Sequence, residues 1–390
     1  MAKRPAKITE STIGEPVDTA PRHDITLLDQ IIGQSQAKGV LQSAMQSGRV
    51  HHAWIFHGPQ GVGKCTAAVA FCAALLDPTT SPDLGGNLAP EPDSPVQQLA
   101  KAGTHPDLHI ITKELAAISR EQTVRDGKQT SIAKDVVEEF LLEPAQRSRV
   151  MTGASRMGKA FIIDEAEMMN AATQNAILKT LEEPPEGTVI VLVTSSEDRL
   201  LTTIRSRCQR VAFTPLSDTE MGAWMKSREE FAAAKGSEKE WLLRFAQGSP
   251  GAALSAIEHG LFAWQEALGP LLDAVSRGKY PPEMAGAMHK LIGEQAEAAV
   301  KANPDASKDA ANKAWMRRML SFIAEDLRQR LRAQAAGKTA EQVQEDMTAQ
   351  RLLAAIDVVV RTEQQMYSNV NQQLLLENLV AQMCAEPVGV

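Results

Sequence analysis

The sequence predicts a mostly parallel α/β domain that is followed by an all-helical region. Two observations carry this prediction: up to Pro215 short apolar runs alternate with helical patterns, and beyond Pro215 only the helical patterns continue. Strands that alternate with helices are typical of a parallel sheet covered on both faces. The chain has 390 residues, of which 43% are hydrophobic, and this is enough for two or three domains with real cores.

Five short apolar runs predict the strands of a five-stranded parallel sheet. They are AWIFHG (53–58), DLHIIT (107–112), KAFIID (159–164), TVIVLVTS (188–195) and QRVAF (209–213). Helical patterns separate them over 64–76, 131–144 and 170–183, and the last of these ends where Pro184 and Pro185 stop a helix. Residues 77–95 are rich in Pro, Gly and Asp, so we expect a loop there.

The remaining segments are a tail and two helical regions. Residues 216–262 predict short helices with a break at QGSPGA, and residues from 263 onward predict helices interrupted at RGKYPPE and KANPDASKD. The first 23 residues carry basic side chains without an apolar stretch, so we expect a disordered tail and not a secretory signal.

Composition narrows the setting in which the protein works. The formal net charge is -7, so contact with DNA would need a local basic patch or a basic partner. Four scattered cysteines favour a reducing compartment over a disulfide framework. Since no apolar run approaches the ~20 residues of a membrane span, we expect a cytoplasmic protein without membrane contact.

The stretch GPQGVGKCT follows the first predicted strand and nearly matches a phosphate-binding loop. Gly58, Gly61 and Gly63 would let the backbone cradle phosphate, and Lys64 would reach the outer phosphates. Cys65 stands where a Ser or Thr hydroxyl would bind Mg²⁺, and a thiol is a poor ligand for this hard cation. Thr66 cannot replace it, because one residue turns a helix by about 100°. A chance glycine turn is the less favoured interpretation.

Two further predicted strands end in polar residues that suit the same site. Asp164 and Glu165 follow the third strand, where nucleotide hydrolases hold Mg²⁺ and polarise water. An acidic turn that caps the next helix is the alternative. Ser195 ends the fourth strand and suits a phosphate contact or a helix cap equally well.

Several long stretches resemble the AAA+ clamp-loader subunits of bacterial DNA polymerase III. They are IIGQSQAKGVLQSAMQSGRVHHAWIFHGPQGVGK, AGTHPDLHII, NAILKTLEEPPEGT, TIRSRCQ and, at the end, NVNQQLLLENLVAQM. The resemblance covers residues 24–260 well. It implies an AAA+ P-loop domain over 24–214 after the tail 1–23, a small helical lid domain over 215–262 and an all-α collar domain over 263–390.

Among these subunits the pattern is most similar to delta-prime, which is regarded as the non-hydrolysing member. Cys65 replaces the hydroxyl residue, GSPGAAL (248–254) lacks the nucleotide-sensing arginine of motor subunits, and no long basic or Pro-rich extension follows the collar. The resemblance therefore implies weak nucleotide binding without turnover in this chain. An active gamma/tau-like motor subunit is the alternative, and a scaffold without any part in an ATP site ranks third.

The motif TIRSRC contains the candidate catalytic residue. The resemblance implies that Arg207 acts in trans as an arginine finger on a neighbour's ATP and Mg²⁺, that Ser206 helps to position the loop and that Cys208 is buried and inert. Arg205 matches no family role. A local ion pair between Arg207 and a carboxylate is the alternative.

The resemblance also implies partners and a missing metal. The partners would be the motor subunit gamma/tau, the delta subunit, the sliding clamp and primed DNA, in a hetero-oligomer that belongs to the DNA polymerase (nucleotidyltransferase) holoenzyme. Many relatives carry a four-cysteine zinc module before the AGTHPD stretch. Because residues 73–104 contain neither Cys nor His, we predict that this chain holds no zinc.

Overall fold

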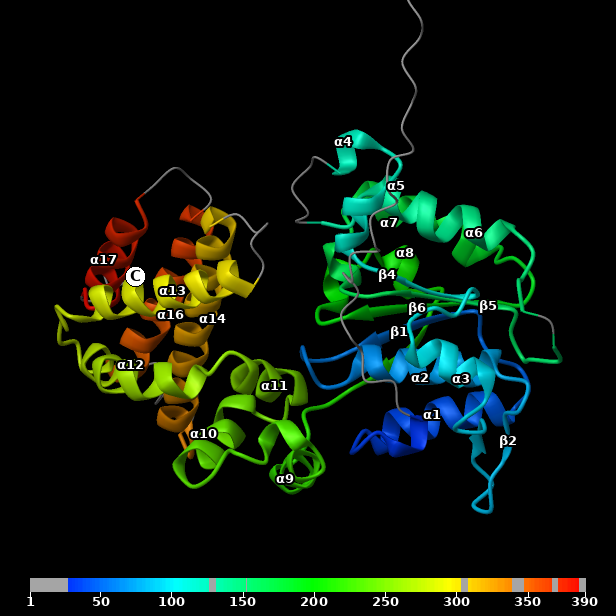
Figure 1. The fold of residues 1–390 in the computed structure, drawn as a ribbon, viewed down its shortest axis with the longest axis horizontal. Helices are drawn as coiled ribbons and strands as arrows, with labels where there is room; N and C mark the ends of the chain where they lie inside the picture. Colours follow the sequence, from blue (N-terminus) through cyan, green and yellow to red (C-terminus); the bar gives the residue numbers. More distant parts are fainter. Residues whose placement is uncertain are drawn as a thin grey trace, which may run out of the picture. The chain divides into compact units, whose positions relative to one another are not determined.

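A five-stranded parallel sheet lies at the centre of the first part of the chain in the computed structural model (Figure 1). Its strands, in chain order, are β1 (Ala53–His57), β4 (Leu108–Ile111), β5 (Lys159–Ile163), β6 (Thr188–Thr194) and β7 (Gln209–Ala212). In space the order is β4-β5-β6-β1-β7, which confirms the predicted sheet and puts β1 between β6 and β7. The structure describes residues 27–125, 131–151, 153–302, 308–338, 347–366 and 371–385, so the predicted tail over 1–23 lies outside the described residues.

Alternate side chains of each strand feed two apolar layers. Trp54 and Phe56 of β1 pack in one layer with α1 (Ser35–Gln46), α2 (Lys64–Leu76) and α3 (Pro95–Lys101). Ala53 and Ile55 pack in the other layer with α5 (Lys134–Val137), α7 (Ala171–Glu182) and α8 (Thr202–Arg205). Figure 1 shows the sheet between these two groups of helices. The period of two along each strand therefore builds a core on both faces.

The stretch predicted as a loop over 77–95 contains a small hairpin. Two-residue strands β2 (Ser81–Pro82) and β3 (Leu88–Ala89) pair in antiparallel fashion. The buried carboxylate of Asp77 ties the start and the end of this segment together, because it accepts hydrogen bonds from Thr79, Ser94 and Gln97. The pairs within the hairpin are too short to leave a strand pattern in the sequence.

The helix predicted over 131–144 is confirmed as helical, but its winding changes along its length. Between α5 and α6 (Glu143–Gln146), residues Glu138–Leu142 (η3) form a π-helical turn, in which the Glu143 amide donates to the Glu138 carbonyl. Pro144 has no N–H to donate, so the next regular α-helical bond cannot form.

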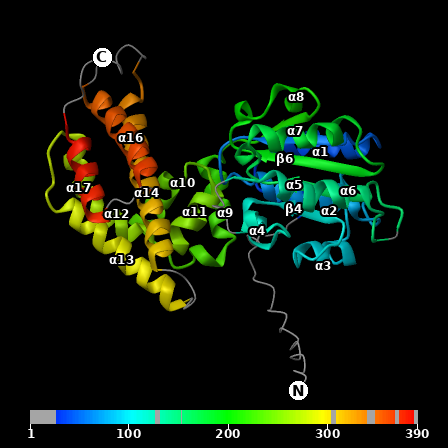
Figure 2. The same cartoon turned by 90° about the horizontal axis from the view of Figure 1, so that it is seen from above.

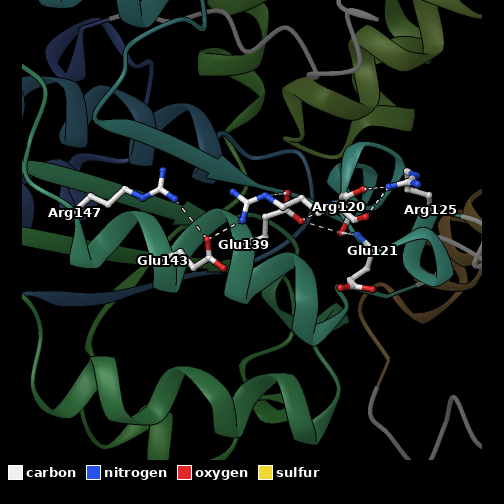
Figure 3. Close-up of polar contacts among 7 residues, drawn as sticks. Arg120, Glu121, Arg125, Glu139, Glu143 and Arg147 are labelled. Carbon is white, nitrogen blue, oxygen red and sulfur yellow. Dashed lines mark hydrogen bonds and ion pairs between the residues drawn. The ribbon is translucent and has the colours of Figure 1, made fainter. Parts of the chain in front are cut away.

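Ion pairs fasten the preceding segment to this helix, as Figure 3 shows. The Arg120 guanidinium lies 3.3 Å from Glu139 and 3.0 Å from Glu143, and Arg147 lies 3.6 Å from Glu143. Arg125, at the end of α4 (Gln122–Arg125), donates to the Ser119 carbonyl at 2.6 Å. Except for Glu139, the side chains of these pairs are about half exposed or more, so we expect each pair to contribute little alone.

Contacts divide the chain into two compact units, Met1–Glu220 and Met221–Val390, and the second unit is helical throughout its described residues. Its main helices are α10 (Ser237–Ala246), α11 (Pro250–Glu258), α12 (Leu261–Ser276), α13 (Met284–Ala302), α14 (Lys308–Ala335), α16 (Met347–Gln365) and α17 (Gln372–Met383), and α9 (Asp218–Lys226) crosses the division. Figure 2 shows α13, α14, α16 and α17 side by side.

Aromatic side chains bind the predicted lid and collar segments into this one unit. Phe245 of α10 stacks on Phe322 of α14 at 6.0 Å between ring centres, and Trp264 of α12 meets Phe322 edge to face at 5.8 Å. The separation into a lid over 215–262 and a collar over 263–390 therefore stays a prediction. No helix of the described residues has the length and apolar character that crossing a bilayer requires.

Candidate nucleotide site and the opposite edge of the sheet

The glycine loop joins β1 to α2, as the motif predicts. Gly58, Gly61 and Gly63 have φ values of 142°, 75° and 97°, which side-chain-bearing residues rarely adopt. At Gly58 a Cβ atom would stand 2.1 Å from the carbonyl oxygen of Phe213, so the loop can pass β7 only with glycine. The loop thus has the close backbone approach and the helix start that a phosphate cradle needs.

Lys64 is turned onto its own loop. Its Nζ donates to the carbonyl oxygens of Gly58 and Pro59 at 2.7 and 2.6 Å, and only 6% of the residue is exposed. Burial lowers the pKa of Lys64, while the nearby carboxylates of Glu167 and Asp164 act in the opposite direction. A phosphate would have to draw this ammonium away from the two carbonyls.

Cys65 faces the acid that the motif predicts. Its thiol is hydrogen-bonded to the Asp164 carboxylate, and burial followed by the charge of Asp164 raises the pKa of Cys65 well above the usual value. The thiol therefore stays protonated at neutral pH and acts as a donor to Asp164. Thr66 is the next residue of α2 and is half-buried. The motif predicts a Mg²⁺ ligand at the position of Cys65, but its sulfur does not suit that ion.

Glu165 is paired with a cation of its own chain. It has the left-handed backbone conformation (φ 49°). Its Oε2 lies 2.5 Å from Nζ of Lys113, the second residue after β4. The sequence patterns did not indicate Lys113. The carboxylate that the motif assigns to polarising water is thus engaged by Lys113.

Glu167 is a site residue that the sequence analysis missed. Its carboxylate accepts hydrogen bonds from the amide and hydroxyl of Ser195, the residue predicted at the end of β6. Burial alone would raise the pKa of Glu167, but the hydrogen bonds of Ser195, Thr194 and the backbone outweigh it and lower that pKa. The only signal in the sequence is that Glu167 is the third acid of DEAE.

The predicted residues do meet at one edge of the sheet, where the carboxyl ends of β1, β5 and β6 lie together. Lys64, Cys65, Glu165 and Ser195 are all engaged by groups of the same chain. In the described part of the chain no three His, Cys, Asp or Glu side chains gather as a metal site. The edge thus has the backbone conformation that the predicted phosphate cradle requires, together with a poor set of Mg²⁺ ligands.

Arg207 lies at the opposite, amino edge of the sheet, where the amino ends of the strands lie together. One residue, Cys208, separates it from β7, and β7 begins at Gln209 beside Trp54, near the start of β1. From Gln209 to Ala212 the strand rises by about 10 Å at 3.3 Å per residue, and only beyond that level does β1 reach the glycine loop. Nη2 of Arg207 lies 2.7 Å from Glu182, and Nη1 donates to the Thr203 carbonyl at 2.8 Å. The local ion pair weighed as the alternative is thus present in this chain.

The residues around Arg207 have local partners as well. Arg205 lies 3.4 Å from Asp198, and the Ser206 hydroxyl donates to the Thr203 carbonyl at 3.1 Å. Cys208 was expected to be buried; it is half-buried because it leads into an edge strand. Burial still raises the pKa of Cys208 to about 12, so its thiol is protonated at neutral pH.

A buried amide of α7 fixes the segment between Ser195 and Arg207. Gln174 donates to the carbonyls of Met169 and Arg199 at 2.9 and 3.1 Å, and its oxygen accepts from the Leu201 amide at 2.7 Å. The sequence analysis missed it, because a glutamine within a helix is usually a surface residue.

The stretch GSPGAAL begins α11, with Ser249 as the N-cap that accepts from the Ala252 amide. A small-domain helix was predicted to start here, and this is confirmed. No Arg or Lys occurs between residues 248 and 258.

Comparisons with known proteins agree with the motifs. Residues 33–217 match the family model described as "DNA polymerase III, delta subunit". The chain is 30% identical to DNA polymerase III subunit delta' of Bacillus subtilis (strain 168) over 183 residues, which is 47% of this chain and 48% of that protein. It is 26% identical to subunit tau of the same organism over 376 residues, which is 91% of this chain and 61% of that protein.

Among solved structures, a DNA polymerase III gamma subunit-related protein of Thermotoga maritima has a TM-score of 0.43 and 15% identity over 90% of this chain and 99% of that one. This chain spans about half to three fifths of the length of the two curated relatives. The matched residues 33–217 include the sheet, the glycine loop and Arg207, and over them this chain is similar to delta-type subunits of DNA polymerase III.

Proposed function

We propose that the chain is a delta-prime subunit of a clamp loader, that it does not turn over ATP itself, and that it supplies Arg207 to the ATP site of a neighbouring subunit. The observation that carries the proposal is the placement of Arg207 at the amino edge of the sheet. Its own glycine loop lies at the carboxyl edge, so a phosphate that Arg207 contacts belongs to another chain.

The carboxyl edge supports the proposal that this chain does not turn over ATP itself. Cys65 replaces the metal-binding hydroxyl, and Glu165 is paired with Lys113. A guanidinium in a neighbour's site stabilises the charge that develops on the transferring phosphate and is worth about 10³ or more in rate. ATP and Mg²⁺ would then be held by the partner, and this chain's own loop would bind nucleotide weakly.

The proposal includes the surroundings of the subunit. The partners are the motor subunit gamma/tau, the delta subunit, the sliding clamp and primed DNA in the cytoplasm, and the chain takes part in replication as a component of the DNA polymerase holoenzyme. We assign the AAA+ domain to 24–214, the lid to 215–262 and the collar to 263–390. DNA would be contacted through its phosphates, by loops or helix N-termini, because the sequence carries no basic-aromatic motif of the kind that reads bases.

An active motor subunit is the second candidate, because the alignment with subunit tau covers 91% of this chain. A steady-state ATPase assay on the isolated chain separates the two candidates.

The proposed function is tested by reconstitution. The chain is mixed with motor subunit, delta, clamp and primed DNA, and assembly is followed by size-exclusion chromatography. We expect a complex whose DNA-stimulated ATPase falls when Arg207 is replaced by Ala, with assembly intact. An intact complex with unchanged turnover would contradict the finger, and failure to assemble would contradict the whole proposal.

A further inference from the structure

The carboxylate that holds Arg207 belongs to the last residue of α7. Glu182 Oε1 lies 2.7 Å from Nη2 of Arg207, and the two side chains are 48% and 36% exposed. Pro184 and Pro185 follow after Glu183 and stop the helix, so Glu182 stands at a defined helix end. The pair joins residues that are 25 positions apart in the chain, and no motif predicted it.

The electrostatics of this helix end favour a cation at this point. The C-terminus of a helix carries a partial negative charge, and two carboxylates, Glu182 and Glu183, stand there. Lys179, one turn earlier, is the only basic residue of the last turn of α7. The guanidinium of Arg207 therefore neutralises an unfavourable accumulation of negative charge.

Both terminal nitrogens of Arg207 are engaged within the chain. Nη2 pairs with Glu182, and Nη1 donates to the carbonyl of Thr203. A guanidinium binds a phosphate best with two parallel N–H groups. A phosphate that binds through these two terminal nitrogens therefore competes with Glu182 and the Thr203 carbonyl for the same N–H groups.

We infer that Glu182 is a latch that retains Arg207 in the free subunit and competes with the neighbour's nucleotide phosphate for it. This inference rests on the proposed function, because it concerns the same arginine. The phosphate wins in the assembled site because it carries more charge than one carboxylate and accepts two hydrogen bonds. The latch thereby weakens the action of Arg207 wherever no nucleotide is correctly placed.

The exposure of the pair sets the size of the effect. Ion pairs between half-exposed side chains are weak, so a latch of this kind lowers the fraction of released Arg207 only a few-fold. Removal of the carboxylate should raise the fraction of released Arg207 by about two- to five-fold at low salt. The gain should appear in kcat/KM, because the finger acts in the transition state.

The test uses Glu182→Gln in the full chain, reconstituted with motor subunit, delta, clamp and primed DNA, with ATP as the probe. Glu183→Gln is the matched control, since it removes a charge from the same helix end but is not an ion-pair partner of Arg207. We expect kcat/KM for ATP to rise about two- to five-fold with Glu182→Gln and to change little with Glu183→Gln. The gain should shrink as salt is raised, because salt screens the latch of the natural chain.

The background of Arg207→Ala separates this inference from the proposed function. If Glu182→Gln alone raises kcat/KM, Arg207→Ala lowers turnover, and Glu182→Gln adds nothing on top of Arg207→Ala, the latch is supported. If Arg207→Ala lowers turnover but Glu182→Gln alone leaves kcat/KM unchanged or lowers it, the latch is refuted and the finger stands. If Arg207→Ala has no effect in an intact complex, both ideas fail together.

Discussion

The two edges of the sheet treat their charged residues differently. At the carboxyl edge Lys64 is buried against its own loop, the Cys65 thiol bonds Asp164, and Glu165 is paired with Lys113. At the amino edge Arg207 is 36% exposed and is held by one half-exposed carboxylate and one backbone carbonyl. We expect a site whose groups satisfy one another to keep its shape without offering chemistry, and a weakly held arginine at the surface to be available to another molecule.

The largest expected effect is that the isolated chain hydrolyses ATP much more slowly than an ordinary enzyme. We expect a turnover at least about 100-fold below the ~1 s⁻¹ of an ordinary enzyme, because the carboxyl edge has a thiol for a metal ligand and a paired acid. Cys65→Ser alone should not restore turnover, since Lys113 still holds Glu165. A coupled ATPase assay measures this, and turnover near ~1 s⁻¹ that disappears with Lys64→Ala would place the chain among the motor subunits.

The stability of the carboxyl edge should depend on one glycine more than on another. Gly58→Ala would drive a Cβ to 2.1 Å from the Phe213 carbonyl, whereas Gly63→Ala meets no atom within 4 Å. We expect Gly58→Ala to lower the free energy of unfolding by about 3 kcal/mol or more, and Gly63→Ala by about 1–2 kcal/mol from backbone strain alone. Urea unfolding followed by circular dichroism measures both, and equal losses would show that the loop does not press on β7.

Glu167 should give this edge a small dependence on pH. Its pKa is lower in the folded chain than in the unfolded one, so the stability it contributes is complete above the unfolded value of ~4.3 and is lost as the pH falls through the folded value. Glu167→Gln should remove the part of the stability loss at low pH that comes from this carboxylate. Ser195→Ala should cost about 1 kcal/mol at pH 7 by deleting one hydrogen bond to this carboxylate. Urea midpoints at pH 7 and pH 4 that fall equally in the natural chain and in Glu167→Gln would contradict the role of Glu167.

The sequence predicted those features that are local. All five strands and the helix after the glycine loop follow from apolar patterns a few residues long, and Gly58, Lys64 and Asp164 follow from motif spacing. The sequence could not predict which side chains pair with the charged residues of the motifs. Lys113 meets Glu165 across 52 positions, and Arg207 meets Glu182 across 25, because the order of the strands brings them together. The partners of Gln174 were not predicted either, since two of its three bonds join α7 to the segment after β6.

The central claim is that the amino edge of this chain serves ATP hydrolysis and its carboxyl edge does not. The most direct measurement compares Arg207→Ala, Arg207→Glu and Lys64→Ala in the same reconstituted complex with clamp and primed DNA, under saturating ATP. We predict that Arg207→Ala lowers DNA-stimulated turnover, that charge reversal lowers it further because it places an anion beside phosphates, and that Lys64→Ala changes it little. If Lys64→Ala abolishes turnover while Arg207→Ala leaves it unchanged in an intact complex, the roles of the two edges are reversed and the claim is wrong.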